Sequence, residues 1–231
     1  MMERTKAFIK SLLPGGAGVH RRVSDAVQSL GRGAPGMEEI FSSIYLRNEW
    51  ADPETVSGRG STLARTEAIR GLLADLLESV GARTLLDAPC GDFNWLRYVD
   101  LRGVEYTGAD VVPELVERNQ REYGGAGRGF IVLDITRDPP PRSDVILCRD
   151  CFIHLSFAHI GAAVANFKRS GSAYLFATTH SGVAVNTDTP SGGWRQVNLL
   201  LPPFNFPPPE RFLTEDAESG KQLGMWRLEE L

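Results

Sequence analysis

A chain of 231 residues suits one large domain, or a core domain with a modest appendage, and it can bury a substantial core. Hydrophobic residues make up 42% and charged residues 23%, as in ordinary globular proteins, and the net charge of −4 lacks the basic surplus that nucleic-acid binding needs. Three cysteines, an odd number, do not make a disulfide framework and fit a reducing cytoplasm.

Membrane insertion and export are not indicated by the sequence. No apolar run approaches the ~18–20 residues of a membrane span. The apolar cluster at the start, in "MMERTKAFIKSLLPGG", is interrupted by Lys10, and no export-type apolar segment follows. We therefore expect no targeting segment, no membrane span and a cytoplasmic location.

The first 60 residues are expected to form a helical extension that ends in a loop. "RTKAFIKSLL" at 4–13 and "RRVSDAVQSL" at 21–30 each fit a short helix. A lid or a membrane-surface helix is one interpretation, but a packed helix or a mobile terminus is favoured because each pattern is short. Apolar residues at helical spacing predict a further helix over 37–50, and the loop "ADPETVSGRGS" follows it.

Residues 61–231 are predicted to form the main domain, which opens with a long amphipathic helix. Ser61 and Thr62 offer N-cap oxygens before "LARTEAIRGLLADLLESVG", and Gly81 ends this pattern. Strands and helices then alternate. Strands are predicted at 84–88, 104–110, 129–135, 144–150 and 173–179, and helices at 94–100, 113–123 and 157–171. This alternation predicts a doubly wound parallel sheet, and the continuous apolar strands fit a sheet covered on both faces.

The tail from Ser181 onward has a different composition. It is rich in proline and glycine, with "LPPFNFPPPE" as its stiffest part. The segment "LGMWRLEEL" at 223–231 is predicted to be a closing strand.

Acidic residues follow four successive predicted strands. They are Asp87, Asp110, Asp134 and Asp150. Ligands of open α/β sheets bind outside the carboxyl ends of the strands, so these side chains are candidates for a binding site. Asp110 lies where an acidic residue usually accepts from ribose hydroxyls, about 20 residues beyond the first turn.

The first of these strands is followed by a loop that suits a dinucleotide poorly. The dinucleotide fingerprint needs three glycines to let the backbone approach a pyrophosphate, whereas Pro89 and Phe93 flank Gly91 here. Asp87, with Asp92 in the turn, instead suits a ligand that has a cationic end and no phosphates. An NAD-dependent oxidoreductase is therefore disfavoured but remains an alternative.

Four segments in series resemble a known family. "LLDAPCGDFNW", "YTGADVVPELVERN", "FIVLDIT" and "ILCRDCFIHL" are similar to the successive motifs of class I S-adenosylmethionine-dependent methyltransferases. The resemblance covers residues 57 to about 180, and "LGMWRLEEL" fits the last strand of that family. Pro89 and Phe93 replace two glycines of the family's usual first motif. The resemblance implies a Rossmann-like, mostly parallel, seven-stranded sheet with an N-terminal helical cap.

The resemblance also implies roles for the strand-end residues toward S-adenosylmethionine. Asp87 and Gly91 would contact the methionine part, Asp110 the ribose and Val111 the adenine. Asp134 would accept from the adenine amino group, beside Ile135, and Arg149 would border the methyl group. The other predicted cofactor contacts come from two loops. The loop after the first strand supplies Ala88, Pro89, Asp92 and Phe93. The loop at 51–61, called the covering loop below, supplies Ser57 and Gly58.

Each carboxylate also has a purely structural interpretation. Asp87 could cap the following helix, and Asp134 could cap the turn that follows it. For either residue alone the two interpretations are equally supported. For the four carboxylates together the functional interpretation is favoured, because residues that only cap helices or turns need not occur at the ends of neighbouring strands.

Cys148, Cys151 and His154 have the spacing C-x-x-C-x-x-H, which invites a zinc site. Buried cysteines that act as small hydrophobes are favoured, since no fourth ligand is evident, and we expect no metal. Asp150 and His154 are the better candidates for proton transfer, with His180 as a further catalytic candidate.

The Pro-stiffened tail is predicted to cover the substrate. Trp194, Arg195 and Phe204 are the candidate substrate contacts, and packing against the edge of the sheet is the alternative for each. Arg149, Arg195 and His180 hint weakly at an anionic acceptor.

Together these features predict a methyltransferase that uses S-adenosylmethionine to methylate an oxygen or nitrogen of a small molecule or sugar. Nucleic acid is not an expected partner, and the oligomeric state is left open. Besides the NAD-dependent oxidoreductase, the alternatives are a non-catalytic cofactor-binding protein of the same fold and a transferase that uses a modified cofactor.

Overall fold

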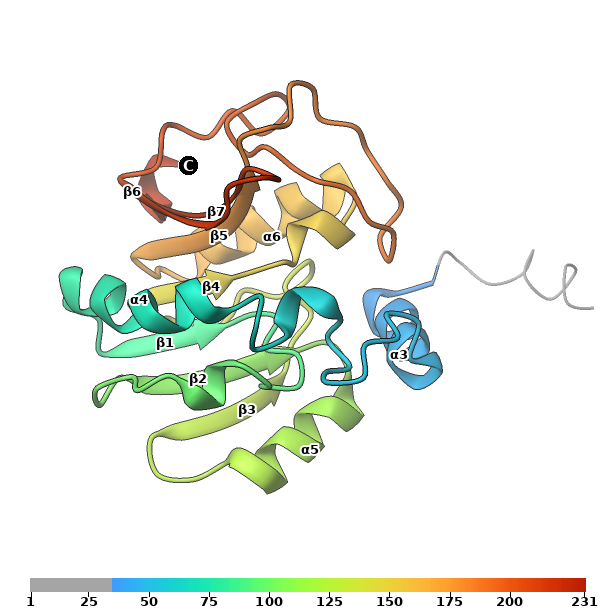
Figure 1. The fold of residues 1–231 in the computed structure, drawn as a ribbon, viewed down its shortest axis with the longest axis vertical. Coiled ribbons are helices and arrows are strands. Elements are labelled where there is room, and N and C mark those ends of the chain that lie inside the picture. The colour runs from blue at the N-terminus through green and yellow to red at the C-terminus, as the bar shows by residue number, and fades with distance from the viewer. Residues whose placement is uncertain (1–34) are drawn as a thin grey trace, which may run out of the picture. The chain divides into compact units, whose positions relative to one another are not determined.

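The computed structural model describes residues 35–231 (Figure 1). The helices predicted at 4–13 and 21–30 lie outside the described residues. Residues Met37–Leu231 form one compact unit. The boundary predicted between residues 60 and 61 stays a prediction.

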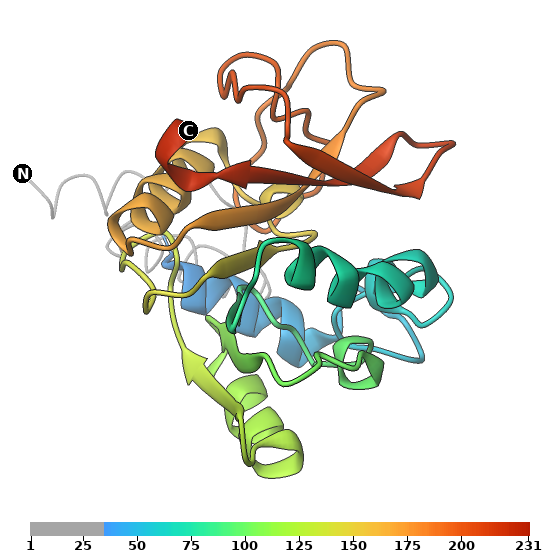
Figure 2. The same cartoon turned by 90° about the vertical axis from the view of Figure 1, so that its left-hand side faces the viewer.

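A seven-stranded sheet forms the centre of this unit, in the order β3-β2-β1-β4-β5-β7-β6. The strands are β1 (Thr84–Asp87), β2 (Glu105–Asp110), β3 (Arg128–Val132), β4 (Val145–Cys148), β5 (Tyr174–His180), β6 (Arg211–Asp216) and β7 (Lys221–Arg227). The first five pair in parallel, while β7 is antiparallel to β5 and β6 is antiparallel to β7 (Figures 1 and 2). The predicted doubly wound, mostly parallel sheet is confirmed.

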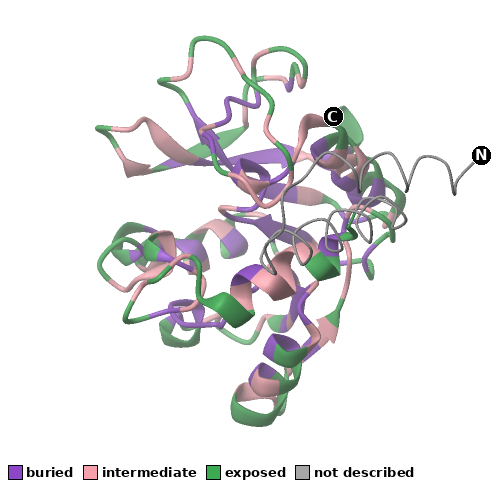
Figure 3. Ribbon diagram, turned by 90° about the vertical axis from the view of Figure 1, so that its right-hand side faces the viewer, coloured by how far each residue is buried: buried purple, intermediate pink, exposed green. Residues whose placement is uncertain are grey.

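Successive residues of the central strands enter two different hydrophobic clusters. Leu85 and Leu147 belong to one cluster, whereas Leu86 and Ile146 belong to the other. Side chains alternate between the faces of a strand, so a run of buried apolar residues needs a core on each side. The continuous apolar runs in the sequence therefore reflect a sheet covered on both faces, and Figure 3 shows the buried residues concentrated in the strands.

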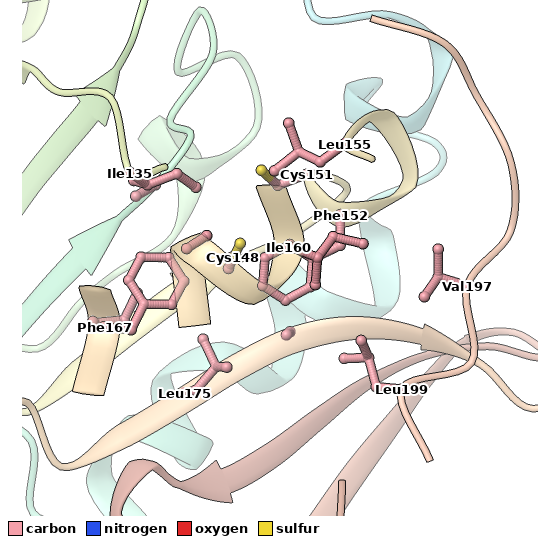
Figure 4. Packing of buried hydrophobic residues seen from close by; sticks show 14 of the residues in the cluster. Ile135, Cys148, Cys151, Phe152, Leu155, Ile160, Phe167, Leu175, Val197 and Leu199 are labelled. Atoms are coloured by element: carbon pink, nitrogen blue, oxygen red, sulfur yellow. The ribbon is translucent and has the colours of Figure 1, made fainter. Parts of the chain in front are cut away.

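Helices on both sides of the sheet complete the two clusters. α4 (Glu67–Ser79) contributes Ile69, Leu73 and Leu77, spaced along one helix face, to the same cluster as Leu85. α5 (Pro113–Tyr123) joins that cluster through Val116. α6 (Phe157–Arg169) contributes Ile160, Ala163 and Phe167 to the opposite cluster, around Cys148 and Leu175 (Figure 4).

Some element predictions were wrong in detail. The helix predicted over 94–100 is only a 3-10 turn, Leu96–Tyr98, and the helix predicted over 37–50 is α3 (Met37–Arg47). β7 begins at Lys221 and ends at Arg227, before a final 3-10 turn. β6 was not located, because this edge strand buries only Leu213 and shows no clear apolar pattern.

The parallel topology brings the carboxyl ends of β1 to β5 to one edge of the sheet. In Figure 1 the arrowheads of β1 and β2 point toward α3 at that edge. Within residues 35–231, none of the helices is long and apolar enough to cross a bilayer.

Candidate functional site

A cavity of about 500 Å³ lies at the carboxyl ends of the parallel strands. Its walls come from α3, the segment 50–65, the strand ends, the segment 194–196 and the β6–β7 hairpin. The predicted site residues that line it are Ser57, Gly58, Asp87, Pro89, Gly91, Asp110, Val111, Asp134, Ile135, Arg149, Asp150, His154, His180 and Trp194. The structure therefore brings most of the predicted residues together.

Two buried carboxylates end the neighbouring strands β1 and β2. Asp87 accepts a hydrogen bond from the Tyr106 hydroxyl at 2.9 Å, and burial raises the pKa of Asp87 to about 7 despite this bond. Asp110 accepts from the backbone N–H groups of Gly91 and Val112, each at 3.1 Å. Burial raises the pKa of Asp110 to about 6, although these N–H groups favour the ionised form. Both groups therefore titrate near neutral pH.

Gly91 lets the covering loop approach the strand ends closely. Its φ of +54° is in the left-handed region, and a Cβ there would lie 2.2 Å from Ser57 Oγ. Only glycine leaves room for Ser57 at this point, so the single glycine kept in the first loop has a steric reason.

Asp92 holds the covering loop and does not line the cavity, and its contact with a cofactor stays a prediction. Its carboxylate accepts from the Thr55 hydroxyl at 2.8 Å, from Val56 N–H at 3.0 Å and from the Ser57 hydroxyl at 2.9 Å. Asp92 N–H donates to Ser57 Oγ in turn. Asp92 therefore acts on the cavity through the position of Ser57.

Asp92→Ala is expected to loosen the covering loop without unfolding the domain. The variant leaves the Thr55 hydroxyl and Val56 N–H without their acceptor, at about 1–3 kcal/mol for each group that stays buried. Exchange of the Val56 amide hydrogen should accelerate at least tenfold, as measured by NMR. Asp138→Ala, which removes an exposed carboxylate, is the matched control. Unchanged protection at Val56 would mean that another contact holds the loop.

Ala88 and Phe93 do not line the cavity either, and their predicted contacts with a cofactor stay predictions. Ala88 is fully buried in the hydrophobic cluster that contains Leu86. Phe93 is buried in the opposite cluster, with its ring 5.0 Å from that of Tyr106 and 5.3 Å from that of Phe130. The phenyl side chain in the first motif thus fills the core beneath the loop and leaves the cavity free.

Asp134 lines the cavity while also capping its turn. One carboxylate oxygen, Oδ1, accepts from the N–H and the hydroxyl of Thr136, at 2.9 and 2.6 Å. The structural and functional interpretations of Asp134 are therefore compatible. Val111 and Ile135 provide apolar surface on the cavity wall, and both pack in the same hydrophobic cluster.

Arg149 and Asp150 belong to a cluster of four charged side chains. The Arg149 guanidinium donates to Glu215 Oε2 at 2.6 Å and to the Gly60 carbonyl at 2.9 Å, and lies 3.2 Å from Asp150 Oδ2. Lys221 Nζ lies 2.6 Å from the same Asp150 oxygen. Burial opposes the ionised form of Asp150, but the two cations lower its pKa below the usual value. Arg149 is thus committed to protein partners.

His154 has one ring nitrogen fixed by the protein and the other without a partner among the described residues. Nδ1 lies 2.8 Å from the Gly193 carbonyl, which can only accept, so Nδ1 carries the proton and Nε2 keeps a lone pair. The Trp50 ring stacks on the imidazole, with centroids 4.8 Å apart. Burial lowers the pKa of His154, which keeps the ring neutral. His180 is also buried, and burial lowers its pKa.

The segment 193–197 runs between the His154 turn and the end of β5. Arg195 N–H donates to the Ile153 carbonyl at 3.0 Å, and His180 N–H donates to the Val197 carbonyl at 2.8 Å. Because side chains alternate along an extended segment, Trp194 and Gln196 line the cavity while Arg195 and Val197 are buried behind it.

Arg195 and Phe204, which were predicted to contact the substrate, do not line the cavity, and these contacts stay predictions. The Arg195 guanidinium donates to the carbonyls of Phe152 and Leu155 and holds the segment in place. Phe204 packs edge-on against Phe157, with ring centroids 5.2 Å apart, and does not line the cavity. Alternation from Trp194 would have pointed to Gln196, which the sequence analysis missed.

The two cysteines of the C-x-x-C-x-x-H segment are buried in the cluster around Phe152 and Ile160 (Figure 4). In residues 35–231, no group of three or more His, Cys, Asp or Glu side chains is placed to hold a metal ion.

Comparisons with known proteins identify the architecture. No family model and no curated protein matches the sequence. The structure resembles 1,6-didemethyltoxoflavin-N1-methyltransferase from Burkholderia thailandensis, which has 1,6-didemethyltoxoflavin and S-adenosylhomocysteine bound. The TM-score is 0.55 at 18% identity, over 93% of this chain and 92% of that chain.

Two further solved structures are similar. The N-methyltransferase NodS from Bradyrhizobium japonicum, in complex with S-adenosylhomocysteine, has a TM-score of 0.55 at 16% identity, over 79% of this chain and 97% of that one. Human N-acetylserotonin methyltransferase, in complex with S-adenosylmethionine, has a TM-score of 0.52 at 13% identity, over 87% of this chain and 61% of that one. The described part of this chain has the Rossmann-like fold of the class I S-adenosylmethionine-dependent methyltransferases.

Proposed function

We propose that the protein is a cytoplasmic methyltransferase that uses S-adenosylmethionine to methylate an oxygen or nitrogen of a small molecule or sugar. The observation that carries the proposal is the pair of buried carboxylates, Asp87 and Asp110, at the ends of neighbouring strands, with Gly91 between them. They share one cavity with His154, whose Nε2 has no protein partner among the described residues. The cavity thus joins acceptors for a cationic, ribose-bearing ligand to a candidate base.

The residues present fit this cofactor. Asp110 has two carboxylate oxygens for two ribose hydroxyls, and Asp87 suits an ammonium group. Val111 and Ile135 offer apolar surface for an adenine ring. The cavity volume of about 500 Å³ lies within the range of small-molecule sites. The three similar structures described above contain S-adenosylmethionine or its demethylated product.

When bound, S-adenosylmethionine supplies a methyl group on a sulfonium, so the acceptor atom bonds to that carbon, the carbon–sulfur bond breaks, and a hydroxyl acceptor must lose its proton. His154 Nε2 is the best candidate to take this proton, because its ring is neutral and Nδ1 is fixed. Asp150 is less suited, since two cations stabilise its ionised form. Positioning of the acceptor by the cavity walls would supply most of the remaining catalysis.

The two alternative functions, an NAD-dependent oxidoreductase and a non-catalytic cofactor-binding protein, would require different features of the first loop and of the acceptor side of the cavity. An NAD-dependent oxidoreductase needs a loop that cradles a pyrophosphate, whereas Ser57 of the covering loop occupies the approach to Gly91. A non-catalytic cofactor-binding protein needs no neutral imidazole beside the cavity. The free, buried cysteines, Cys90, Cys148 and Cys151, suit a reducing compartment.

Mass spectrometry of the ligand that co-purifies with the full chain tests the proposal. We expect S-adenosylmethionine or S-adenosylhomocysteine, and transfer of labelled methyl from added S-adenosylmethionine to an acceptor in a cell extract. A co-purified NAD, or retention of the cofactor without any labelled product, would favour one of the two alternatives.

Cofactor affinity is expected to fall as the pH falls from 8 to 5. The ammonium group and the ribose hydroxyls of the cofactor donate hydrogen bonds, and ionised carboxylates accept them best. The pKa values of Asp87 and Asp110 are about 7 and about 6 in the ligand-free site. Lowering the pH therefore protonates first Asp87 and then Asp110, and binding at pH 6.5 should release protons. Calorimetry with S-adenosylhomocysteine in two buffers of different ionisation enthalpy measures this release. Proton uptake, or an affinity that rises on acidification, would contradict the assignment of these carboxylates.

A further inference from the structure

The acceptor side of the cavity combines exposed aromatic surface with polar groups. Trp194 is 64% exposed although it lines the cavity, and it follows directly after Gly193, whose carbonyl binds His154. Two residues further along, Gln196 lines the same wall, next to the carbonyl of Val197 that binds His180. Trp194, Gln196, His154 and His180 thus surround one part of the cavity.

The charged side chains in this part of the cavity are neutralised by one another. Arg149 and Lys221 pair with Asp150 and Glu215, all within 2.6 to 3.4 Å. Arg65 pairs with Asp216 at 3.6 Å. Arg59, the remaining lining cation, is exposed on the covering loop.

Arg195 offers no charge to a ligand either, because its guanidinium donates to backbone carbonyls behind the wall. The hint of an anionic acceptor that Arg149, Arg195 and His180 gave in the sequence therefore loses its basis. An acceptor that carries a phosphate or carboxylate would find no buried, unpaired cation in this part of the described cavity. Burying such a charge without a partner is costly.

The groups that remain available are uncharged. Among the described residues, the Gln196 side-chain amide makes no hydrogen bond, and it offers both donors and an acceptor. His154 Nε2 and His180 Nε2 likewise have no partner among these residues. The Trp194 indole offers a broad apolar face for stacking.

Resting on the proposed function, we propose that the acceptor is an uncharged ring that bears hydroxyl groups. An apolar face of the ring stacks on Trp194, its hydroxyls bind Gln196 and His180, and the methylated atom is a hydroxyl oxygen that gives its proton to His154 Nε2. Sugars and hydroxylated aromatic rings share this chemistry. Phosphorylated acceptors and amines do not, because a phosphate lacks a counter-ion here and a protonated amine finds the carboxylates of this side already paired with cations.

The test measures binding and methyl transfer with the full chain. Saturation-transfer NMR in the presence of S-adenosylhomocysteine probes two neutral sets, methyl glycosides and catechol-type phenols. Each set has matched phosphorylated and amino counterparts. The same panel is then incubated with labelled S-adenosylmethionine. Members of one neutral set should bind and accept a methyl group. The set that responds shows whether the acceptor is a sugar or a hydroxylated aromatic ring.

Trp194→Ala and Gln196→Ala should each weaken the binding of the responding ring at least fivefold while the affinity for S-adenosylhomocysteine stays constant. Val185→Ala, at an exposed apolar residue of the same tail that does not line the cavity, is the matched control. Preference for a phosphorylated or amino counterpart would overturn the inference, as would binding that is indifferent to both variants. Failure of every neutral ring to bind, with S-adenosylhomocysteine bound, would overturn it too. Absence of S-adenosylhomocysteine binding would instead overturn the proposed function itself.

Discussion

Asp110→Ala is expected to lower the affinity for S-adenosylhomocysteine about 100-fold. Each hydrogen bond from a ribose hydroxyl to an ionised carboxylate contributes ~1.5–3 kcal/mol, and water replaces part of this in the variant. A net loss of about 3 kcal/mol corresponds to about two orders of magnitude in the dissociation constant. The variant also removes the acceptor for Gly91 N–H, so the first loop loses an anchor. Isothermal titration calorimetry measures the change.

Two variants separate the ribose contact from general damage. Asp110→Asn keeps the size of the side chain and one acceptor oxygen, so its loss of affinity should be smaller than that of Asp110→Ala. Asp138→Ala removes an exposed carboxylate and should leave the affinity unchanged. A folded Asp110→Ala variant with unaltered affinity would remove Asp110 from the cofactor site.

His154→Ala is expected to slow methyl transfer by about 10²- to 10⁴-fold, the usual contribution of a positioned base. The ring is prepared for this role, because the Gly193 carbonyl fixes the proton on Nδ1 and the stacked Trp50 fixes the plane. Cofactor affinity should stay nearly constant, because the cofactor is held by Asp87 and Asp110 and not by His154. Once an acceptor is identified, single-turnover experiments measure the rate of methyl transfer. Calorimetry measures the cofactor affinity separately.

His159→Ala is the matched control for this variant. His159 lies in α6, bonds to the Ser191 hydroxyl at 2.7 Å and does not line the cavity. At saturating cofactor, wild-type transfer should decline only at a pH below the usual pKa of histidine, because burial lowers the pKa of His154. Loss of cofactor affinity with a normal transfer rate at saturation would place His154 in the cofactor site and contradict its role as a base.

The sheet could be predicted from the sequence because its central strands carry an unmistakable pattern. Leu85, Leu86 and the run Val145–Cys148 are buried on both faces, so no polar residue interrupts them. β6 lacked such a pattern, since an edge strand with one buried residue leaves the other positions free to be polar. The 3-10 turn at Leu96–Tyr98 looked like a helix because its few apolar residues fill the core beneath the first loop.

The candidate site was predictable where it lies close to the strand ends. Asp87, Asp110 and Asp134 lie at the carboxyl ends of strands that were predicted to be parallel. The topology alone therefore places them at one edge of the sheet. Glu215 and Lys221 were missed because they reach the cavity only through the β6–β7 hairpin.

Trp50 was missed because its position depends on a contact distant in sequence, whereas alternation from Trp194 would have pointed to Gln196. Trp50 stacks on His154, which lies more than one hundred residues later, and no local pattern reports that contact. Phe93 and Arg195 were assigned to the site from their neighbours in sequence, whereas packing and alternation turn both side chains toward the core.

The most direct test of the central claim is calorimetric titration of the full-length protein with S-adenosylhomocysteine and, separately, with NAD. We expect one S-adenosylhomocysteine bound per chain at pH 8, weaker binding at pH 5 and no binding of NAD. Binding of NAD in place of S-adenosylhomocysteine, or an affinity for S-adenosylhomocysteine that is indifferent to Asp110→Ala, would contradict the central claim.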